Sequence, residues 1–105
     1  MMYGPRLQRT THDAAVDQIA TWIVQGRFPA GAVLPTEVAL GDQLGVSRTV
    51  VREAAKVLAA KGMVEAKKRV GTRILPQSCW NLLDPVVVSW VLKGPRRLEM
   101  IRDLI

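Results

Sequence analysis

The sequence predicts a mainly α-helical domain that contains a small β-hairpin and is followed by a linker and one or two short helices. Three observations support this fold class. Apolar residues recur at helical spacing in three successive segments before Gly62. After Gly62 the pattern changes to two short β-prone runs that flank a basic turn. Beyond Pro76 the composition changes again, and an Asp-Pro helix start appears.

The first helix is predicted from about Thr11 to Gln25, and Gly26 ends it. Its apolar stripe consists of Ala15, Val16, Ile19, Trp22 and Ile23. His12 lies beside this stripe and is interpreted as structural, because a lone histidine is a poor metal site. Residues 1–9 are predicted to be a mobile arm, in which Arg6 and Arg9 are able to touch phosphate.

A turn-rich connector follows over residues 28–35, with a short strand predicted at Val33–Leu34. Thr36 is a good N-cap for a second helix, and Glu37 is favourably placed in its first turn. This helix is short and extends to about Gln43. Its candidates for packing are Val38 or Ala39, together with Leu40 and Leu44.

The third helix carries the strongest functional signal. Gly45 allows a tight turn before it, Ser47 is a good N-cap, and Gly62 suits the position after its C-terminus. Val51, Ala54, Ala55 and Leu58 share one apolar face, while Arg48, Arg52 and Lys56 form a basic stripe beside Thr49. A helix with these two faces can pack on a domain and enter the major groove of DNA.

Two short strands are predicted at residues 63–66 and 72–75. Between them lies a basic tip that runs from Lys67 to Gly71, with the glycine supplying the turn. Pro76 ends the unit. Three helices followed by a β-hairpin define a winged helix-turn-helix, which is predicted over residues 10–76.

Residues 77–105 form a different kind of sequence. Residues 77–83 are a linker that carries Trp80, and Asp84-Pro85 starts a helix. Val86 to Val88 alone would suggest a strand, but the Asp-Pro start and the spacing of Leu83, Val87, Trp90 and Val91 favour a helix. A second amphipathic helix is predicted from Arg96 to Ile105, with no visible cover for its apolar face. We therefore expect either that the chain is a fragment or that these helices pack on a partner subunit. Trp80 and Trp90 are expected to pack a domain or dimer contact.

The charge distribution narrows the function classes. The chain has 105 residues, 49% of them apolar, and a formal charge of +6. Residues 36–75 contain eight basic and four acidic residues, a net +4, so the excess lies on the third helix and the hairpin. Such clustering favours a polyanion or an acidic surface as partner.

Other function classes find little support. There is no Ser/His/Asp set, no Cys/His pair at ligand spacing and no phosphate-cradling glycine loop, so an enzyme is not expected. Cys79 is the single cysteine, which excludes an internal disulfide. We expect a cytoplasmic protein, because no apolar signal core and no run of about 18 apolar residues occurs.

Several motifs together carry a family resemblance. They are G-x-x-L-P-T-E at 31–37, L-G-V-S-R-T-V-V-R-E-A at 44–54, K-G-M-V at 61–64, and Gly71-Thr72. This pattern resembles the DNA-binding domain of the GntR family of bacterial regulators, most of all its FadR-like branch, over about Asp13 to Pro76. Residues 80–90 are similar to the linker of sugar-acid regulators of that branch, such as the galactonate type.

The resemblance implies a homodimer that binds a short, near-palindromic operator in double-stranded DNA, most commonly as a repressor. It also implies a helical C-terminal domain that binds a metabolite, often with a metal, of which residues 77–105 would be only the start. No cofactor is expected in this chain itself. The third helix, about 47–61, would enter the major groove, and the wing, 67–72, would lie at the minor groove. The implied DNA contacts are Thr36, Ser47, Arg48, Thr49, Arg52, Lys67, Lys68, Arg69, Gly71 and Thr72.

Two positions depart from the family pattern. Val38 stands where the family usually has a DNA-contacting arginine. That contact is therefore either lost or made by another basic residue, such as Arg69 or Lys68. Gly41 stands where the family prefers alanine, which is expected to weaken the second helix by up to ~1 kcal/mol.

Two alternatives to this function are a winged helix that binds a protein or RNA, and a regulator of another GntR branch. The alternative for Arg48 and Arg52 is that they are exposed charges that only pair with Glu53 or Asp42.

Overall fold

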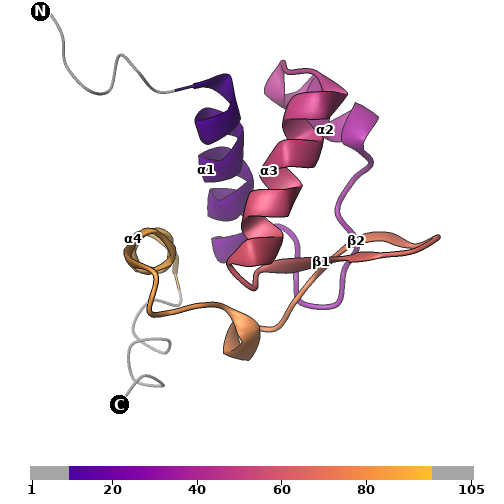
Figure 1. The fold of residues 1–105 in the computed structure, drawn as a ribbon. Helices are drawn as coiled ribbons and strands as arrows, with labels where there is room; N and C mark the ends of the chain where they lie inside the picture. Colours follow the sequence, from indigo (N-terminus) through magenta and orange to yellow (C-terminus); the bar gives the residue numbers. More distant parts are fainter. Residues whose placement is uncertain (1–9, 96–105) are drawn as a thin grey trace, which may run out of the picture.

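The computed structural model describes residues 10–95 and confirms the predicted fold class. Its elements are α1 (Thr11–Val24), α2 (Glu37–Leu44), α3 (Arg48–Ala60), β1 (Val64–Lys67), β2 (Gly71–Ile74), a 3₁₀ turn (Gln77–Cys79) and α4 (Pro85–Leu92). In Figure 1, α1 and α3 lie side by side, the hairpin projects to one side of them, and α4 lies on the other. The predicted arm at 1–9 and the second C-terminal helix at 96–105 lie outside the described residues.

Side-chain caps explain where the helices begin. The Thr10 hydroxyl accepts a hydrogen bond from the amide of Asp13, whose carboxylate accepts in return from the Thr10 amide, so α1 starts with a capping box. Thr36, Ser47 and Asp84 each cap the helix that follows them, as the sequence predicts. Each cap satisfies an amide that the first helical turn leaves unpaired.

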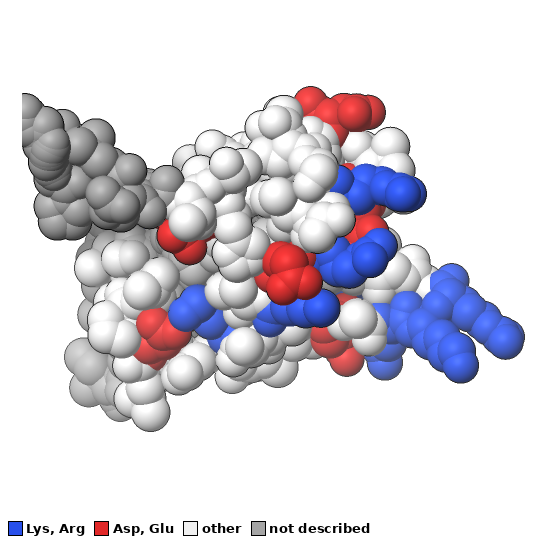
Figure 2. Space-filling model, turned by 45° about the horizontal axis from the view of Figure 1, so that its top comes forward, with Lys and Arg blue, Asp and Glu red and all other residues white. Residues whose placement is uncertain are grey.

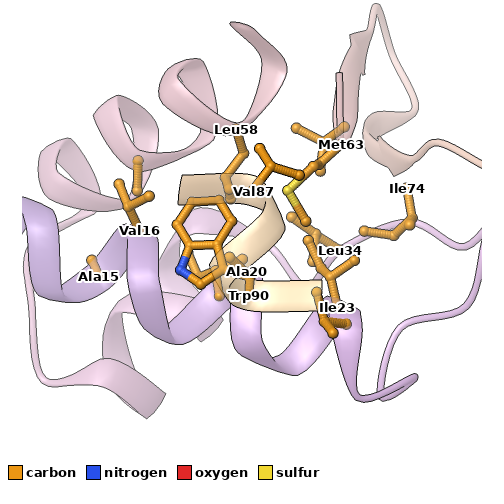
Figure 3. Close-up of a cluster of buried hydrophobic side chains, with 14 of the residues drawn as sticks. Ala15, Val16, Ala20, Ile23, Leu34, Leu58, Met63, Ile74, Val87 and Trp90 are labelled. Carbon is orange, nitrogen blue, oxygen red and sulfur yellow. The ribbon is translucent and has the colours of Figure 1, made fainter. Parts of the chain in front are cut away.

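A single apolar cluster joins the helices and the hairpin. The largest fully buried side chains include Ile19 of α1, Leu40 of α2, Leu58 of α3 and Ile74 of β2. Figure 3 shows Leu58, Met63, Leu34 and Ile74 at the junction of the helices with the hairpin. Trp22, predicted to belong to the core, is only half-buried, because it lies at the rim of the cluster with the Arg27 guanidinium 4.3 Å above its ring.

The hairpin is antiparallel, and an extended segment of the connector pairs with the outer side of β2. Val64 pairs with Ile74 and Lys67 pairs with Gly71. On the other side of β2, Val33 forms a bridge with Arg73, and the Leu34 amide donates to the Thr72 carbonyl at 2.7 Å. The predicted extended segment at Val33–Leu34 is thus present as a single bridge, which ties the wing to the start of α2.

The turn at the wing tip differs from the prediction. The left-handed residue is Arg69, with φ of 67°, inside a turn closed by a hydrogen bond from the Val70 amide to the Lys67 carbonyl. Gly71 also has a positive φ, but it is the first residue of β2, and its α-carbon faces Val33. A glycine is easier to recognise in a sequence than an arginine held in this conformation, because few non-glycine residues adopt it.

Residues 77–95 fold back onto the other helices. Trp80 and Trp90 are both buried, which confirms their predicted packing role within this chain. The Trp90 indole N–H donates to Asp17 of α1 at 2.7 Å, and Figure 3 shows the Trp90 ring beside α1, near Val16 and Ala20. Leu83 was expected on the buried face of α4, but it is 91% exposed because it precedes the helix, within a turn.

Within residues 10–95, no helix is both long enough and apolar enough to cross a lipid bilayer.

Candidate nucleic-acid interface

The angle between α2 and α3 depends on two glycines. Gly45 adopts the left-handed conformation with φ of 71° and lets the chain reverse after α2. The Val46 amide then donates to the Gly41 carbonyl at 2.9 Å. A β-carbon on Gly41 would lie only 2.7 Å from the Val46 carbonyl oxygen. Gly41, predicted only to weaken the helix, lacks a side chain where the turn packs closely against α2.

The first turns of α3 present polar side chains outward. Arg48, Thr49 and Arg52 are exposed, whereas Val51 and Ala54 are buried beneath them. The predicted two-faced character of this helix is therefore confirmed. Arg48 forms no hydrogen bond or ion pair among residues 10–95, although its charge acts on Glu37, so its N–H donors are available to a partner.

Two hydroxyls occur at the helix starts on this surface. Thr36 Oγ1 accepts from the Ala39 amide at 3.1 Å, and Ser47 Oγ accepts from the Val50 amide at 3.2 Å. In each case the hydroxyl acts as acceptor, so its own proton remains able to donate to a phosphate oxygen. The N-terminus of α3 adds unpaired amides that favour an anion.

Arg52 has a partner that the sequence analysis did not identify. Its Nε lies 3.2 Å from Glu37 Oε2 and its Nη2 lies 3.0 Å from Oε1, a two-pronged ion pair between α3 and α2. The hydrogen bond from Arg52 lowers the pKa of the Glu37 carboxyl and raises the pKa of the guanidinium. Arg52 therefore pairs with neither Glu53 nor Asp42, and Glu53 pairs with Lys56 at 3.1 Å. Fifteen residues separate Glu37 from Arg52, and no sequence pattern relates them.

The wing supplies the second part of the basic surface. Lys68 and Arg69 are exposed at its tip, and Lys67 lies 3.9 Å from Glu65, a long contact between half-buried residues. Figure 2 shows Lys and Arg side chains gathered at the protruding end of the molecule, with a broken band of further basic and acidic side chains behind it. Arg52 and Lys56 of α3 line one groove together with Ala66 and Thr72 of the hairpin, so the basic stripe of α3 and the wing border the same surface.

A groove of about 300 Å³ joins the helical and wing parts of the interface. Thr36 and Glu37 line it at the start of α2, and Val51 and Ala55 line it from α3. Ile19, Leu34, Pro35 and Leu40 also belong to its lining, and the wing forms the remaining side. Its wing-side residues are Val70, Gly71 and Thr72. Of the ten predicted contact residues, Thr36, Gly71 and Thr72 are therefore brought to one groove, while Ser47, Arg48, Thr49 and Arg52 are on or next to α3.

Val38 lies exposed in the first turn of α2, with 51% of its surface accessible. It is thus not one of the packing residues of α2, whose buried positions are Leu40 and Gly41. In the part of the chain that the structure describes, no group of three or more His, Cys, Asp or Glu side chains is placed to hold a metal ion.

Residues 11–74 match a protein family described as bacterial regulatory proteins, gntR family. The match covers more than half of the chain and spans α1 to the end of the wing. The chain belongs to this family of regulators, which confirms the predicted family and the expectation of a regulator in place of an enzyme.

Curated relatives extend the comparison. The chain is 47% identical over 83 residues to the uncharacterized HTH-type transcriptional regulator YieP of Escherichia coli, a match covering 79% of this chain and 36% of that protein. It is 36% identical over 95 residues to the galactonate operon transcriptional repressor of E. coli, covering 88% and 42%. It is 42% identical over 90 residues to a probable D-xylose utilization operon transcriptional repressor of Paenarthrobacter nicotinovorans, covering 85% and 39%. The chain thus spans about two fifths of the length of these relatives.

Solved structures include DNA complexes. The DNA-binding domain of AraR bound to operator ORE1 matches with a TM-score of 0.63 and 29% identity, covering 70% of this chain and 89% of that one. A GntR protein of Streptococcus agalactiae matches with a TM-score of 0.59 and 31% identity, covering 65% and 32%. These matches confirm the winged helix-turn-helix fold.

Proposed function

We propose that this chain is the DNA-binding part of a metabolite-responsive transcriptional repressor, and that the exposed face of α3 enters the major groove of duplex DNA while the wing lies along the minor groove. The observation that carries the proposal is the placement of Arg48, Thr49 and Arg52 on one exposed helix face beside the basic wing. The names of two relatives, repressors of galactonate and D-xylose operons, support sugar-acid or related carbon catabolism as the regulated pathway.

The residues have separable roles in this proposal. Arg48 has a free guanidinium, which can offer two parallel donors to guanine O6 and N7, a contact worth ~1–3 kcal/mol of base discrimination. Ser47, Thr36 and the α3 amides hold phosphates and set the register. Lys67, Lys68 and Arg69 add charge along the wing, where each neutralised phosphate contributes about 0.9 to the salt slope.

The assembly is part of the same proposal. A homodimer would place two copies of α3 on a near-palindromic operator, because the symmetry of such a site mirrors that of the protein. We assign the binding of the effector, and of a metal if one is used, to the region that the relatives possess and this chain does not span. We place the protein in the bacterial cytoplasm, where its operator is.

The first test is selection of bound duplexes from a random library by the 105-residue chain, followed by fluorescence anisotropy at two salt concentrations. Recovery of a preferred site, with affinity that falls steeply as salt rises, is the expected result. Salt-sensitive binding without a preferred site would leave only the phosphate contacts in place. The absence of binding at low salt would overturn the proposal and favour a protein partner.

Two variants separate base recognition from phosphate binding. Arg48→Ala is expected to weaken binding to the selected site by roughly 5- to 150-fold and binding to random duplex much less, since it removes a base contact. Lys68→Ala is expected to weaken both by a similar factor and to reduce the salt slope by about 0.9. An unchanged ratio of selected-site to random affinity in Arg48→Ala would disprove the base-contact role of Arg48.

A further inference from the structure

The Glu37–Arg52 pair lies within the proposed DNA interface rather than apart from it. Glu37 is the first residue of α2 and lines the groove between the helices and the wing, and Arg52 lies one turn after Arg48 on the exposed face of α3. Both side chains are largely accessible, at 57% for Arg52 and 41% for Glu37. Exposed ion pairs add little stability, typically 0–1 kcal/mol, so stability alone is a weak reason for this arrangement.

The geometry of the pair leaves part of Arg52 available. Glu37 takes the edge of the guanidinium formed by Nε and Nη2. A guanidinium has five N–H donors, so the edge formed by Nη1 and the second Nη2 proton is still unused. Within residues 10–95, Arg52 forms hydrogen bonds and an ion pair only with Glu37, while the charge of Glu53 acts on it without such a bond. The unused edge carries two parallel donors, the arrangement that matches guanine O6 and N7 or a phosphate.

We infer that Glu37 is a positioning residue that holds the Arg52 guanidinium ready for a base contact and limits binding to the wrong sequence; this inference rests on the proposed DNA-binding function. An arginine already held in place loses less side-chain freedom when it binds. If Arg52 leaves Glu37 to bind a phosphate, the unpaired Glu37 carboxylate repels the DNA backbone. Binding of Arg52 to phosphate without a base contact is therefore unfavourable. Specificity arises from both the attractive and the repulsive part.

This role has a signature that a purely structural role lacks. Glu37→Gln removes a negative charge near DNA and frees Arg52. Affinity for random duplex is therefore expected to rise, while the ratio of selected-site to random affinity falls roughly two- to tenfold, the range for immobilising one side chain. Loss of folding would instead lower both affinities.

The experiment measures both affinities by fluorescence anisotropy for the wild-type chain, Glu37→Gln, Arg52→Ala and the double variant, using the duplex selected by the wild type. Glu53→Gln is the matched control, because it removes a carboxylate charge that also acts on Arg52 but forms no hydrogen bond with it, the ion pair of Glu53 being with Lys56. The control is expected to raise random-duplex affinity and leave the ratio unchanged. In the Arg52→Ala background, Glu37→Gln is expected to leave the ratio unchanged as well.

Distinct results contradict distinct claims. If the wild type selects no preferred duplex, the proposed function fails. If it selects one, and Glu37→Gln and Glu53→Gln give the same ratio as the wild type, the positioning role of Glu37 is wrong while the proposed function stands. A ratio that falls equally in Glu37→Gln with and without Arg52 would also overturn the inference, since Glu37 would then act without Arg52.

Discussion

At the scale of single residues, Gly62 determines how the segment after the wing meets the end of α3. It adopts φ of 78° directly after α3, and a β-carbon there would lie 2.2 Å from the Cys79 carbonyl oxygen. The Asn81 amide donates to the neighbouring Lys61 carbonyl at 2.9 Å. A side chain at position 62 would therefore have to displace the backbone of the linker as well as strain its own backbone.

Gly62→Ala is expected to lower the free energy of unfolding by roughly 2–3 kcal/mol, which exceeds the conformational cost of alanine alone. Gly26→Ala is the matched control, because Gly26 has φ of 86° but no atom within 4 Å of a β-carbon. Chemical denaturation of both variants measures the difference between them. Equal losses would mean that the linker does not press on Gly62 in solution.

Individual residues also show why the interface was only partly predictable. The cap residues Thr36 and Ser47 could be identified from local sequence, because capping depends on residues three positions apart. The Glu37–Arg52 pair could not, because it depends on the angle between two helices. The packing role of Gly41 could not be predicted for the same reason, because the Val46 carbonyl that lies against its α-carbon comes after the turn.

At the scale of elements, the tip of the wing is both strained in its backbone and positively charged. Arg69 has φ of 67°, a conformation that costs an L-residue other than glycine roughly 1–2 kcal/mol. In a molecule selected for stability alone, glycine would be the favoured residue at this turn. An arginine there is consistent with the proposed contact between the wing and DNA phosphates.

Arg69→Gly is expected to raise the free energy of unfolding by roughly 0.5–1 kcal/mol and to reduce the salt slope of DNA binding by about 0.9, so stability and affinity change in opposite directions. Thermal denaturation and salt titration measure the two effects. Lys68→Gly is the control: Lys68 has no positive φ, so the same loss of charge is expected to lower stability. A less stable Arg69→Gly would refute the account of the tip.

Elements were more predictable than their ends. Period-3.6 patterns and caps were sufficient for α1, α2 and α3, and the Asp-Pro start outweighed three successive valines in α4. Leu83 was misplaced because spacing alone does not show where the first helical turn begins. The turn at Arg69 was assigned to Gly71 because the tertiary contact with Val33 that accompanies Gly71 is not visible in the sequence.

At the scale of the whole molecule, α3 and α4 are joined by an ion pair. Lys61, at the end of α3, lies with its Nζ 2.6 Å from Oδ2 of Asp84, the N-cap of α4, and each side chain is only 20% exposed. The hydrogen bond from Lys61, followed by that from the Val86 amide, lowers the pKa of the Asp84 carboxyl. The end of α3 is therefore attached to the segment that follows the wing.

This pair makes stability depend on pH. A carboxyl with a lowered pKa in the folded state contributes fully above its unfolded pKa of about 3.9, and that contribution is lost as pH falls through the lower folded value. Asp84→Asn keeps a good N-cap but removes the charge. Denaturation at pH 7 and at acid pH is expected to show that the wild type is the more stable at pH 7 and that its advantage shrinks in acid. An advantage that stays constant with pH would contradict the role of the ion pair.

The burial of two tryptophans in the segment after the wing provides an optical signal for its docking. The chain has three tryptophans, and two of them, Trp80 and Trp90, are buried in the apolar cluster through residues 77–92. Release of this segment from α1 would transfer both indole rings to water and shift their fluorescence emission to longer wavelength, while α1 to α3 kept their helical circular dichroism. Intrinsic emission therefore separates undocking of α4 from unfolding of the winged helix without any attached dye.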